Sequence, residues 1–195
     1  NNGRDVDMSH LPSDFKLLQE RVNKYKQDGK IVVGTCCSVR HIKGLNQIIE
    51  ALIKDESLVF LLVGDGPELN KLKQVALNSG VYSRFLTVGH KQTAYHYMPL
   101  FDVYVMPSLS EGFGLALLEA VALKKKVVCS NLAIFKEAFT ENEITFFKLS
   151  DIESLISSIH SAYSDHSKSQ KAFERYLNQY TVKSMTDRYH SLFSQ

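Results

Sequence analysis

The sequence lacks the marks of a membrane-spanning protein. Its uninterrupted apolar runs reach about six residues, as at 58–63, whereas a helix needs roughly 20 to cross a bilayer. No secretory leader, with its charged and then apolar segments, opens the chain. We therefore expect a cytoplasmic protein, with any membrane contact peripheral and at the inner face.

The sequence also has few cysteines and a small net charge. The three cysteines are the adjacent Cys36 and Cys37 and the distant Cys129, which indicates reduced, buried thiols rather than a disulfide framework. No Cys or His pair has the spacing of a zinc site. Lys and Arg number 23 against 21 Asp and Glu, and a net charge of +2 argues against nucleic-acid binding. The sequence thus predicts neither a metal centre nor a nucleic-acid interface.

The length and composition are those of one globular domain. The chain has 195 residues, 44% hydrophobic and 23% charged, which is enough to bury a core. We find no internal repeat and no low-complexity tract. The chain begins at Asn1 rather than at a methionine, which we interpret as the start of an excised fragment.

Short β-rich segments alternate with helical patterns along the chain. The β-rich segments are apolar on both faces, as parallel strands covered by helices are. They are residues 31–37, 58–63, 84–88, 103–106, 127–129 and 144–147. Apolar residues at helical spacing mark the other elements. These are residues 14–27, 45–54, 68–78, 93–100, 115–123, 132–139, 152–163, 168–179 and 182–193.

Repeated strand–helix units predict an α/β fold, a doubly wound parallel sheet of about six strands with helices on both faces. In such sheets ligands bind beyond the carboxyl ends of the strands, so the loops that leave strands are the ones to search. Gly66 and Pro67 suit the start of the helix at 68–78, since proline fits a first turn, and Gly80 suits its end.

The loop after the fourth strand, 107–114, is the most informative. Gly112 and Gly114 precede the helix at 115–123, and small residues there leave backbone amides open to a ligand. Free amides and the positive end of the helix dipole make a helix start a ready phosphate site. This loop is therefore predicted to bind a phosphate group.

Glu111 and Glu119 flank that helix start, eight positions apart. If the whole stretch were helical, they would be separated by about 12 Å, which suits a diphosphate between two hydroxyl-bearing rings. Carboxylates accept hydrogen bonds from vicinal hydroxyls, so one glutamate would hold a ribose and the other a sugar. Glu119 lies in an otherwise apolar run, which argues against a merely solvated side chain.

These residues carry a family resemblance. Pro107-Ser108 followed by Glu111-Gly112-Phe113-Gly114 and Glu119-Ala120 resembles the E-x7-E motif of the group 1 family of retaining glycosyltransferases. Further matches follow in the family's order along essentially the whole chain. They are Asn2-Gly3-x-Asp5, Lys43-Gly44, Val63-Gly64-Asp65-Gly66-Pro67-Glu68, Val88-Gly89-His90 and a closing helix at 180–193.

The family has two Rossmann-like domains that face a cleft, the GT-B architecture. The resemblance implies that residues 1–195 are the C-terminal domain, which binds the nucleotide sugar, and that the N-terminal acceptor domain is absent from this chain. By the same resemblance, Glu111 contacts hydroxyls of the donor sugar and Glu119 holds the ribose. The backbone that would hold sugar and phosphate belongs to Gly112, Phe113, Gly114 and Leu115.

The loop after the first strand, 38–44, supplies the catalytic cations. Lys43 and Arg40 would face the diphosphate and stabilise charge on the leaving group. That role agrees with the metal-independent reaction that the family implies, with no cofactor besides the nucleoside-diphosphate sugar. The family often has an arginine five positions before the lysine, where this chain has Ser38, so Arg40 is expected to supply the guanidinium instead.

Three other segments receive lesser roles. We expect Gly66 to lie close to the donor, Asp65 to be structural, and His90 to present backbone to the base rather than to act in catalysis. The G-x-G-x-x-G dinucleotide fingerprint fails, since its third position is Leu69. The three lysines at 124–126 replace a Gly-x-Pro turn of the family and are interpreted as a solvated turn.

The resemblance implies a hexosyltransferase-type enzyme, in polysaccharide or cell-envelope biosynthesis. It would transfer a sugar, with retention, from a UDP- or GDP-linked donor to an acceptor glycan or a lipid-linked glycan. The N-terminal domain would be the partner that contacts the acceptor and any membrane, so this chain alone is expected to bind a nucleoside diphosphate weakly without transferring sugar. Three alternatives stay open. They are a non-catalytic nucleotide-binding module, a sugar-nucleotide epimerase of the same architecture, and an NAD-binding oxidoreductase domain.

Overall fold

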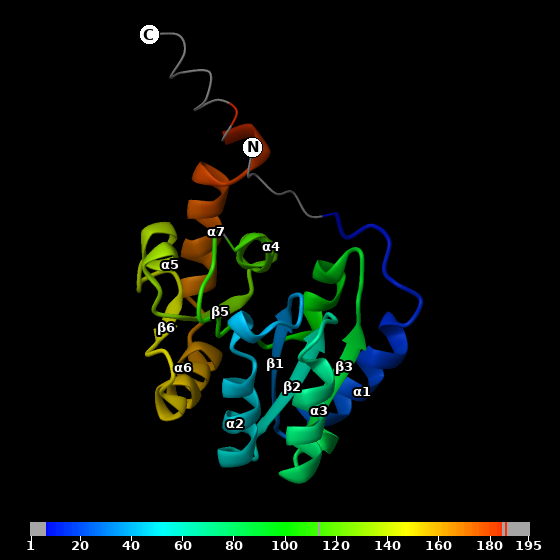
Figure 1. Ribbon diagram of the computed structural model, residues 1–195. Helices are drawn as coiled ribbons and strands as arrows, with labels where there is room; N and C mark the ends of the chain where they lie inside the picture. The colour runs from blue at the N-terminus through cyan, green and yellow to red at the C-terminus, as the bar shows by residue number, and fades with distance from the viewer. Residues whose placement is uncertain (1–6, 113, 185, 187–195) are drawn as a thin grey trace, which may run out of the picture.

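A computed structural model describes residues 7–112, 114–184 and 186. Within them, six strands form one sheet in the order β3-β2-β1-β4-β5-β6, and each neighbouring pair is parallel (Figure 1). The strands are β1 (Ile31–Cys36), β2 (Leu58–Val63), β3 (Phe85–Gly89), β4 (Val103–Met106), β5 (Lys126–Ser130) and β6 (Thr145–Phe147). The predicted parallel sheet is confirmed, and each strand lies within one residue of its predicted ends.

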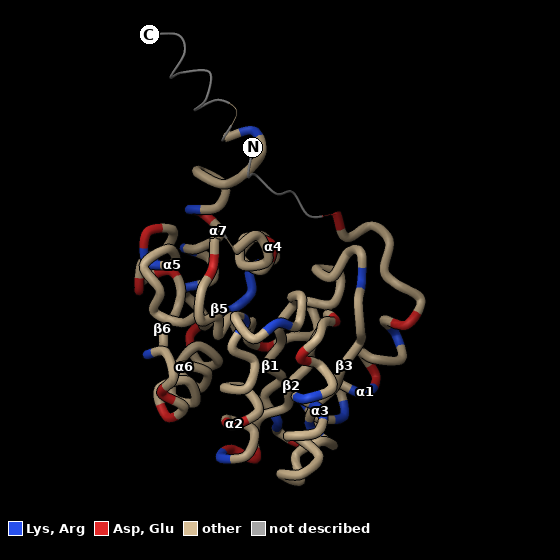
Figure 2. Tube along the Cα trace, viewed as in Figure 1, with Lys and Arg blue, Asp and Glu red and all other residues tan. Residues whose placement is uncertain are grey.

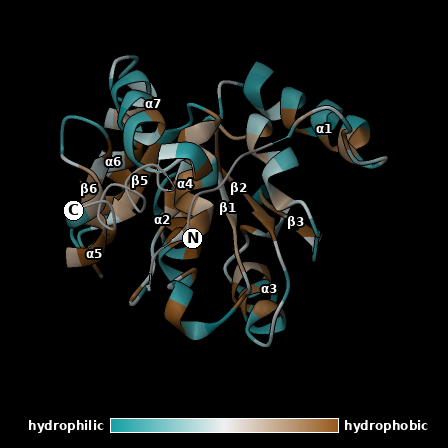
Figure 3. Cartoon of the chain, turned by 90° about the horizontal axis from the view of Figure 1, so that it is seen from above, coloured by the Kyte–Doolittle hydropathy of each residue, from teal (hydrophilic) through white to brown (hydrophobic). Residues whose placement is uncertain are grey.

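Helices cover both faces of the sheet. On one face lie α2 (Asn46–Lys54), α3 (Leu69–Asn78) and α6 (Ile152–Ser164). On the other lie α1 (Phe15–Gln27), the 3₁₀ helix η3 (Ala94–Leu100), α4 (Leu115–Ala122), α5 (Ala133–Ala138) and α7 (Lys168–Gln179). Seen from above, the strands are mostly apolar and the helices turn polar residues outward (Figure 3). Because both sheet faces are buried, the strands are apolar throughout rather than alternating.

Charged residues lie mainly on the helices and loops around this core. Basic and acidic positions alternate along the tube in Figure 2, and no face of a single sign is visible in that view. This distribution agrees with the small net charge of +2.

Three local predictions need correction or completion. The segment at 93–100 is a 3₁₀ rather than an α-helix, since Pro99 inside it has no amide hydrogen to continue an α-helical ladder. The helix predicted at 68–78 begins at Leu69, so Pro67 lies in the turn before it. Gly80 ends that helix with φ +73°, as predicted. Of the last predicted helix, residues 182–184 and 186 are helical, and the remainder lies outside the described residues.

The lysines at 124–126 do not form a simple solvated turn. Lys124 is exposed, with its ammonium 4.5 Å from the centroid of the Phe173 ring. Lys126 donates a hydrogen bond to the backbone oxygen of Tyr163. Burial lowers the pKa of Lys125 to about 8. Lys126 is the first residue of β5 and Lys125 is partly buried, so the interpretation as a solvated turn was wrong for these two lysines.

Gly34 makes room for an aromatic ring beneath the sheet. A Cβ atom at this position would overlap the ring of Phe101, which is buried against Tyr104. We expect Gly34→Ala to lower the free energy of unfolding by about 2–3 kcal/mol, because a packed core resists added volume. Denaturant unfolding measures the loss, and Phe101→Leu in the same chain should restore part of it. Unchanged stability in Gly34→Ala would contradict the packing described here.

Candidate functional site

The candidate site lies where the strand order changes direction. From β1 the chain adds β2 and β3 on one side, whereas β5 and β6 follow β4 on the other. The loops that leave β1 and β4 therefore diverge, and such a switch point opens a crevice at the carboxyl ends of the strands. Lys43 lies in the 3₁₀ helix η1 (His41–Lys43) after β1, and Glu111 lies in the loop after β4.

A cavity of about 450 Å³ opens between these two loops, and we term it the Glu111 pocket. Five residues selected from the sequence line it, namely Lys43, Glu111, Gly112, Gly114 and Leu115. Its other lining residues are Thr35, Cys36, Cys37, Ser38, Met106, Pro107, Ser108 and Ala116. The loops after β1 and β4, which the sequence indicated separately, therefore meet at one cavity.

The polar centre of this pocket is an ion pair. The ammonium of Lys43 contacts Oε1 of Glu111, and their side chains are 21% and 10% exposed. The hydroxyl of Ser108, itself buried, donates to the same carboxylate oxygen at 3.2 Å. Because both charges are partly withdrawn from water, their attraction is screened less by solvent and salt than that of a surface pair. A ligand that enters here meets a positioned cation and a positioned carboxylate.

The start of α4 forms one wall of the pocket. Gly114 has φ +73°, a left-handed conformation that glycine adopts without strain, and α4 begins at the next residue. The first amides of an α-helix have no intrahelical acceptor, and those of Leu115 and Ala116 belong to residues that line the pocket. The predicted phosphate site is thus at a true helix start. Since α4 begins only at Leu115, Glu111 lies in the loop, and the all-helical spacing of about 12 Å does not apply.

A second cavity of about 330 Å³ adjoins the first, and we term it the Glu119 pocket. The two pockets share Cys36, Cys37, Ser38 and Ala116. The remaining lining residues of the Glu119 pocket are Val63, Gly64, Asp65, His90, Lys91, Ala94 and Glu119. Glu119 is 8% exposed, so its carboxylate is not a solvated surface group. The two glutamates therefore lie in neighbouring compartments of one crevice.

The floor shared by the two pockets contains thiols. Burial raises the pKa of Cys36 well above its usual range, and the nearby carboxylate of Glu119 raises it further. Burial likewise raises the pKa of Cys37 to about 12, against a smaller opposite effect of Lys43. Both side chains are therefore neutral thiols at physiological pH. The predicted free thiols are confirmed, although Cys37 is only half-buried because it faces the pockets.

Lys91 is a pocket residue that the sequence did not single out. Its ammonium lies 2.5 Å from a carboxylate oxygen of Asp14, and the hydroxyl of Tyr97 donates to that carboxylate. The contact with Asp14 raises the pKa of Lys91. His96, in η3, contacts the backbone oxygen of Asp7 at 2.6 Å. The loop beside the Glu119 pocket is thus fastened to the segment that leads into α1, a long-range contact that no motif indicates.

Two predicted site residues that the structure describes are not brought into these pockets. Arg40 is exposed and lines neither of them. Gly66 lines neither, and its geometry has a packing cause, since a Cβ there would lie 2.5 Å from the backbone oxygen of Val39. Phe113 lies outside the described residues, as does the Asn2-Gly3-x-Asp5 segment. The functional roles given to Arg40 and Gly66 stay predictions.

The described part of the chain has neither a cluster of metal-binding side chains nor a membrane-spanning helix. No group of three or more His, Cys, Asp or Glu side chains in that part of the chain is placed to hold a metal ion. Among the helices of residues 7–112, 114–184 and 186, none is long and apolar enough to cross a membrane.

Comparison with known sequences places this chain among characterised proteins. The family model described as glycosyl transferases group 1 matches residues 18–179. The O-antigen biosynthesis glycosyltransferase WclY of Escherichia coli is 28% identical over 187 residues, which cover 93% of this chain and 53% of WclY. The chain thus spans about half the length of that relative.

Solved structures share the fold. Anabaena HepE, crystallised in complex with UDP, superposes with a TM-score of 0.84 at 21% identity, covering 99% of this chain and 56% of HepE. The C-terminal domain of a glycosyl transferase group 1 family protein from Francisella tularensis superposes with a TM-score of 0.67 at 19% identity. That match covers 91% of this chain and 100% of the domain. The likeness therefore extends over the whole of a C-terminal domain.

Proposed function

This chain belongs to the group 1 glycosyl transferases, and from that membership we propose that it is the donor-binding half of a retaining, metal-independent enzyme. Its substrate is a nucleoside-diphosphate sugar, which binds across the Glu111 and Glu119 pockets. The N-terminal domain of the full-length protein faces this crevice and holds the acceptor.

One observation carries the proposal. Glu111, in the loop before α4, and Glu119, within α4, line adjoining pockets, and Ala116 in the first turn of that helix lines both. A diphosphate on the first amides of α4 would leave the sugar in the Glu111 pocket and the ribose beside Glu119. The pocket volumes of about 450 and 330 Å³ leave room for a sugar with its phosphates and for a nucleoside.

The reaction that fits this arrangement is glycosyl transfer. The bond between the anomeric carbon and the diphosphate oxygen breaks, and its electron pair leaves with the diphosphate. A hydroxyl oxygen of the acceptor forms the new bond to the same carbon, and its proton passes to the departing diphosphate oxygen, which holds the electron pair of the broken bond. Lys43 would turn from Glu111 towards the phosphate and stabilise the negative charge that develops there, while Glu111 would be released to accept from sugar hydroxyls.

Two similar proteins suggest a candidate donor and a candidate biosynthetic pathway. HepE was crystallised with UDP-glucose, so we take a UDP-sugar as the first candidate donor and a GDP-sugar as the second. WclY acts in O-antigen biosynthesis, which supports a role in assembling a bacterial surface polysaccharide.

Binding to the chain alone tests the donor site. We expect UDP and at least one UDP- or GDP-sugar to bind with a Kd between about 1 µM and 1 mM, the range of ordinary enzyme substrates. Isothermal titration calorimetry measures it. The chain without its N-terminal domain is expected to transfer no sugar, whereas the full-length protein should release UDP or GDP when donor and acceptor are both present.

The same titration separates the alternative functions. Binding of NAD in place of sugar nucleotides would indicate an oxidoreductase domain. Sugar-nucleotide binding with conversion of one free sugar nucleotide into another by the full-length protein would indicate an epimerase. If no sugar nucleotide binds at millimolar concentration, the proposed donor site is wrong.

A further inference from the structure

A third cavity lies on the other side of the η1 loop from the Glu111 pocket. It measures about 160 Å³, and we term it the Ser150 pocket. Its polar lining residues are His41, Asn46, Gln47, Glu50 and Ser150, and its apolar ones include Leu109 and Ile152. The cavity opens between the first turns of α2 and α6, two helices that pack together. No residue that lines it was assigned to the donor.

A single ridge separates this cavity from the Glu111 pocket. The amide of Leu109 donates to the backbone oxygen of Ile42 at 2.8 Å, which joins the loop after β4 to η1. On one side of the ridge are Lys43 and Ser108, which line the Glu111 pocket. On the other side is the Ser150 pocket, lined by Leu109 itself. A long ligand that lies across the ridge would therefore occupy both the Glu111 pocket and the Ser150 pocket.

The walls of the Ser150 pocket are fixed by a buried amide. Gln47 is 7% exposed, and its Nε2 donates to the backbone oxygens of Pro107 at 2.8 Å and Gly44 at 3.2 Å. Its Oε1 accepts from the amide of Ser150 at 2.9 Å. Ser150 has φ +64°, a conformation that a residue with a side chain rarely adopts. Strained backbone held by a buried network is common at ligand sites.

The side chains that line the Ser150 pocket determine which class of ligand it can bind. Asn46 and Ser150 can donate and accept hydrogen bonds, Glu50 accepts them, and all three are at least partly exposed. Leu109 and Ile152 offer apolar surface. This mixture suits a sugar ring, which has hydroxyl edges and apolar C–H faces. The carboxylate of Glu50 would repel a phosphate, so a second nucleotide does not fit.

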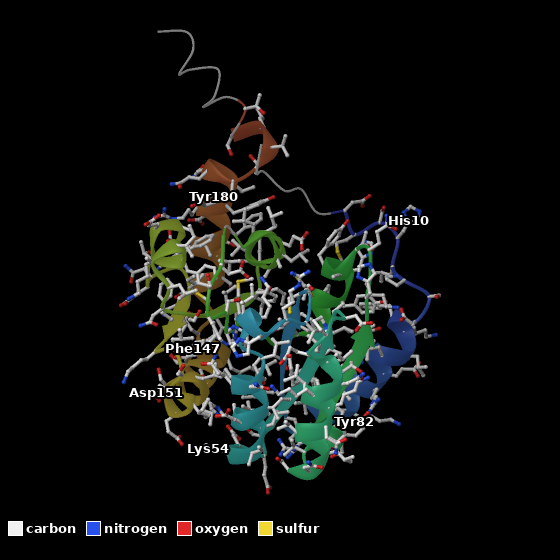
Figure 4. The ribbon with its side chains drawn as sticks, viewed as in Figure 1. His10, Lys54, Tyr82, Phe147, Asp151 and Tyr180 are labelled. Atoms are coloured by element: carbon white, nitrogen blue, oxygen red, sulfur yellow. The ribbon has the colours of Figure 1, made fainter. Side chains whose placement is uncertain are left out.

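We propose that the Ser150 pocket binds a sugar residue of the acceptor glycan, next to the residue that receives the transferred sugar. The inference rests on the proposed function, because only a glycosyltransferase brings an acceptor glycan to this ridge. In this proposal, residues of the C-terminal domain contact the acceptor and contribute to acceptor specificity. Figure 4 labels Asp151, which precedes α6 next to Ser150, and Lys54, the last residue of α2, which lies outside the pocket and pairs with Glu153 at 2.7 Å.

Methyl glycosides of common hexoses and N-acetylhexosamines are suitable probes. In ¹⁵N-correlated NMR spectra of the chain, we expect at least one glycoside at millimolar concentration to shift the amides of Asn46, Glu50 and Ser150 in a saturable way. The double variant Asn46→Ala/Glu50→Ala should weaken that binding about tenfold or more, since two hydrogen-bonding groups are lost. Its affinity for UDP should change less than twofold, because neither residue lines the donor pockets.

Lys54→Ala is the matched control, since it changes the same helix α2 outside the pocket. It should leave glycoside binding unchanged. If UDP binds but no glycoside perturbs the three amides, or if the double variant binds glycoside as well as the parent chain, the inference is overturned. Failure of UDP to bind would instead contradict the proposed function, so the two failures are distinguishable.

Discussion

Replacing Lys43 with methionine in the full-length protein is expected to lower kcat for sugar transfer about 10²–10³-fold. Among the described residues that line the Glu111 pocket, Lys43 is the sole cation, and it already points at the carboxylate beside the helix start. Methionine keeps most of the side-chain length but cannot stabilise the leaving diphosphate. Steady-state kinetics with saturating donor would measure the loss.

Two further variants sharpen this prediction. Lys43→Arg keeps a charge and should recover part of the rate, whereas Lys54→Met removes an exposed lysine far along α2 and should leave kcat unchanged.

Arg40→Ala tests the second cation predicted from the sequence. Since Arg40 is exposed and outside both donor pockets, we expect a smaller loss than for Lys43→Met, and an equal loss would show that the guanidinium reaches the phosphates.

Replacing Glu119 with alanine is expected to weaken binding of UDP itself about 10–100-fold. The buried carboxylate would accept hydrogen bonds from the ribose hydroxyls, and a hydrogen bond to a charged group contributes about 1.5–3 kcal/mol. Alanine favours the helix, so α4 should persist. Calorimetry gives the affinity, and thermal unfolding checks that the variant is folded.

Glu111→Ala is the matched variant in the neighbouring pocket. It should change UDP affinity little, because its proposed contacts are with the sugar, but it should lower affinity for the UDP-sugar and abolish most transfer. Equal losses of UDP and UDP-sugar binding in the two variants would contradict the separate roles given to the two pockets.

The sequence was sufficient to predict the sheet. Strands such as β2, Leu58–Val63, are buried at every position, and their apolar composition follows from helices on both sides. Glu119 was also identifiable, since a lone carboxylate within an apolar helix requires a special environment. Local patterns were enough wherever a residue's surroundings are set by its own element.

Loop geometry was less predictable. Arg40 and Lys43 are three positions apart, yet the turn of η1 directs only Lys43 into the Glu111 pocket. No local pattern indicates Lys91 or the Ser150 pocket, because their neighbours come from distant parts of the chain. In η3 the apolar spacing favours an α-helix, but Pro99 has no amide hydrogen to continue one.

Two glycines beside the pockets allow backbone segments to approach each other closely. A Cβ at Gly44 would overlap the backbone oxygen of Pro107, and one at Gly64 would overlap that of Cys37. These close main-chain contacts fix how the loops after β1, β2 and β4 lie against one another. The side chains of Ser38, Cys37 and Lys91 line the proposed donor site without making these contacts, so we expect substitutions there to change ligand preference while the backbone frame persists.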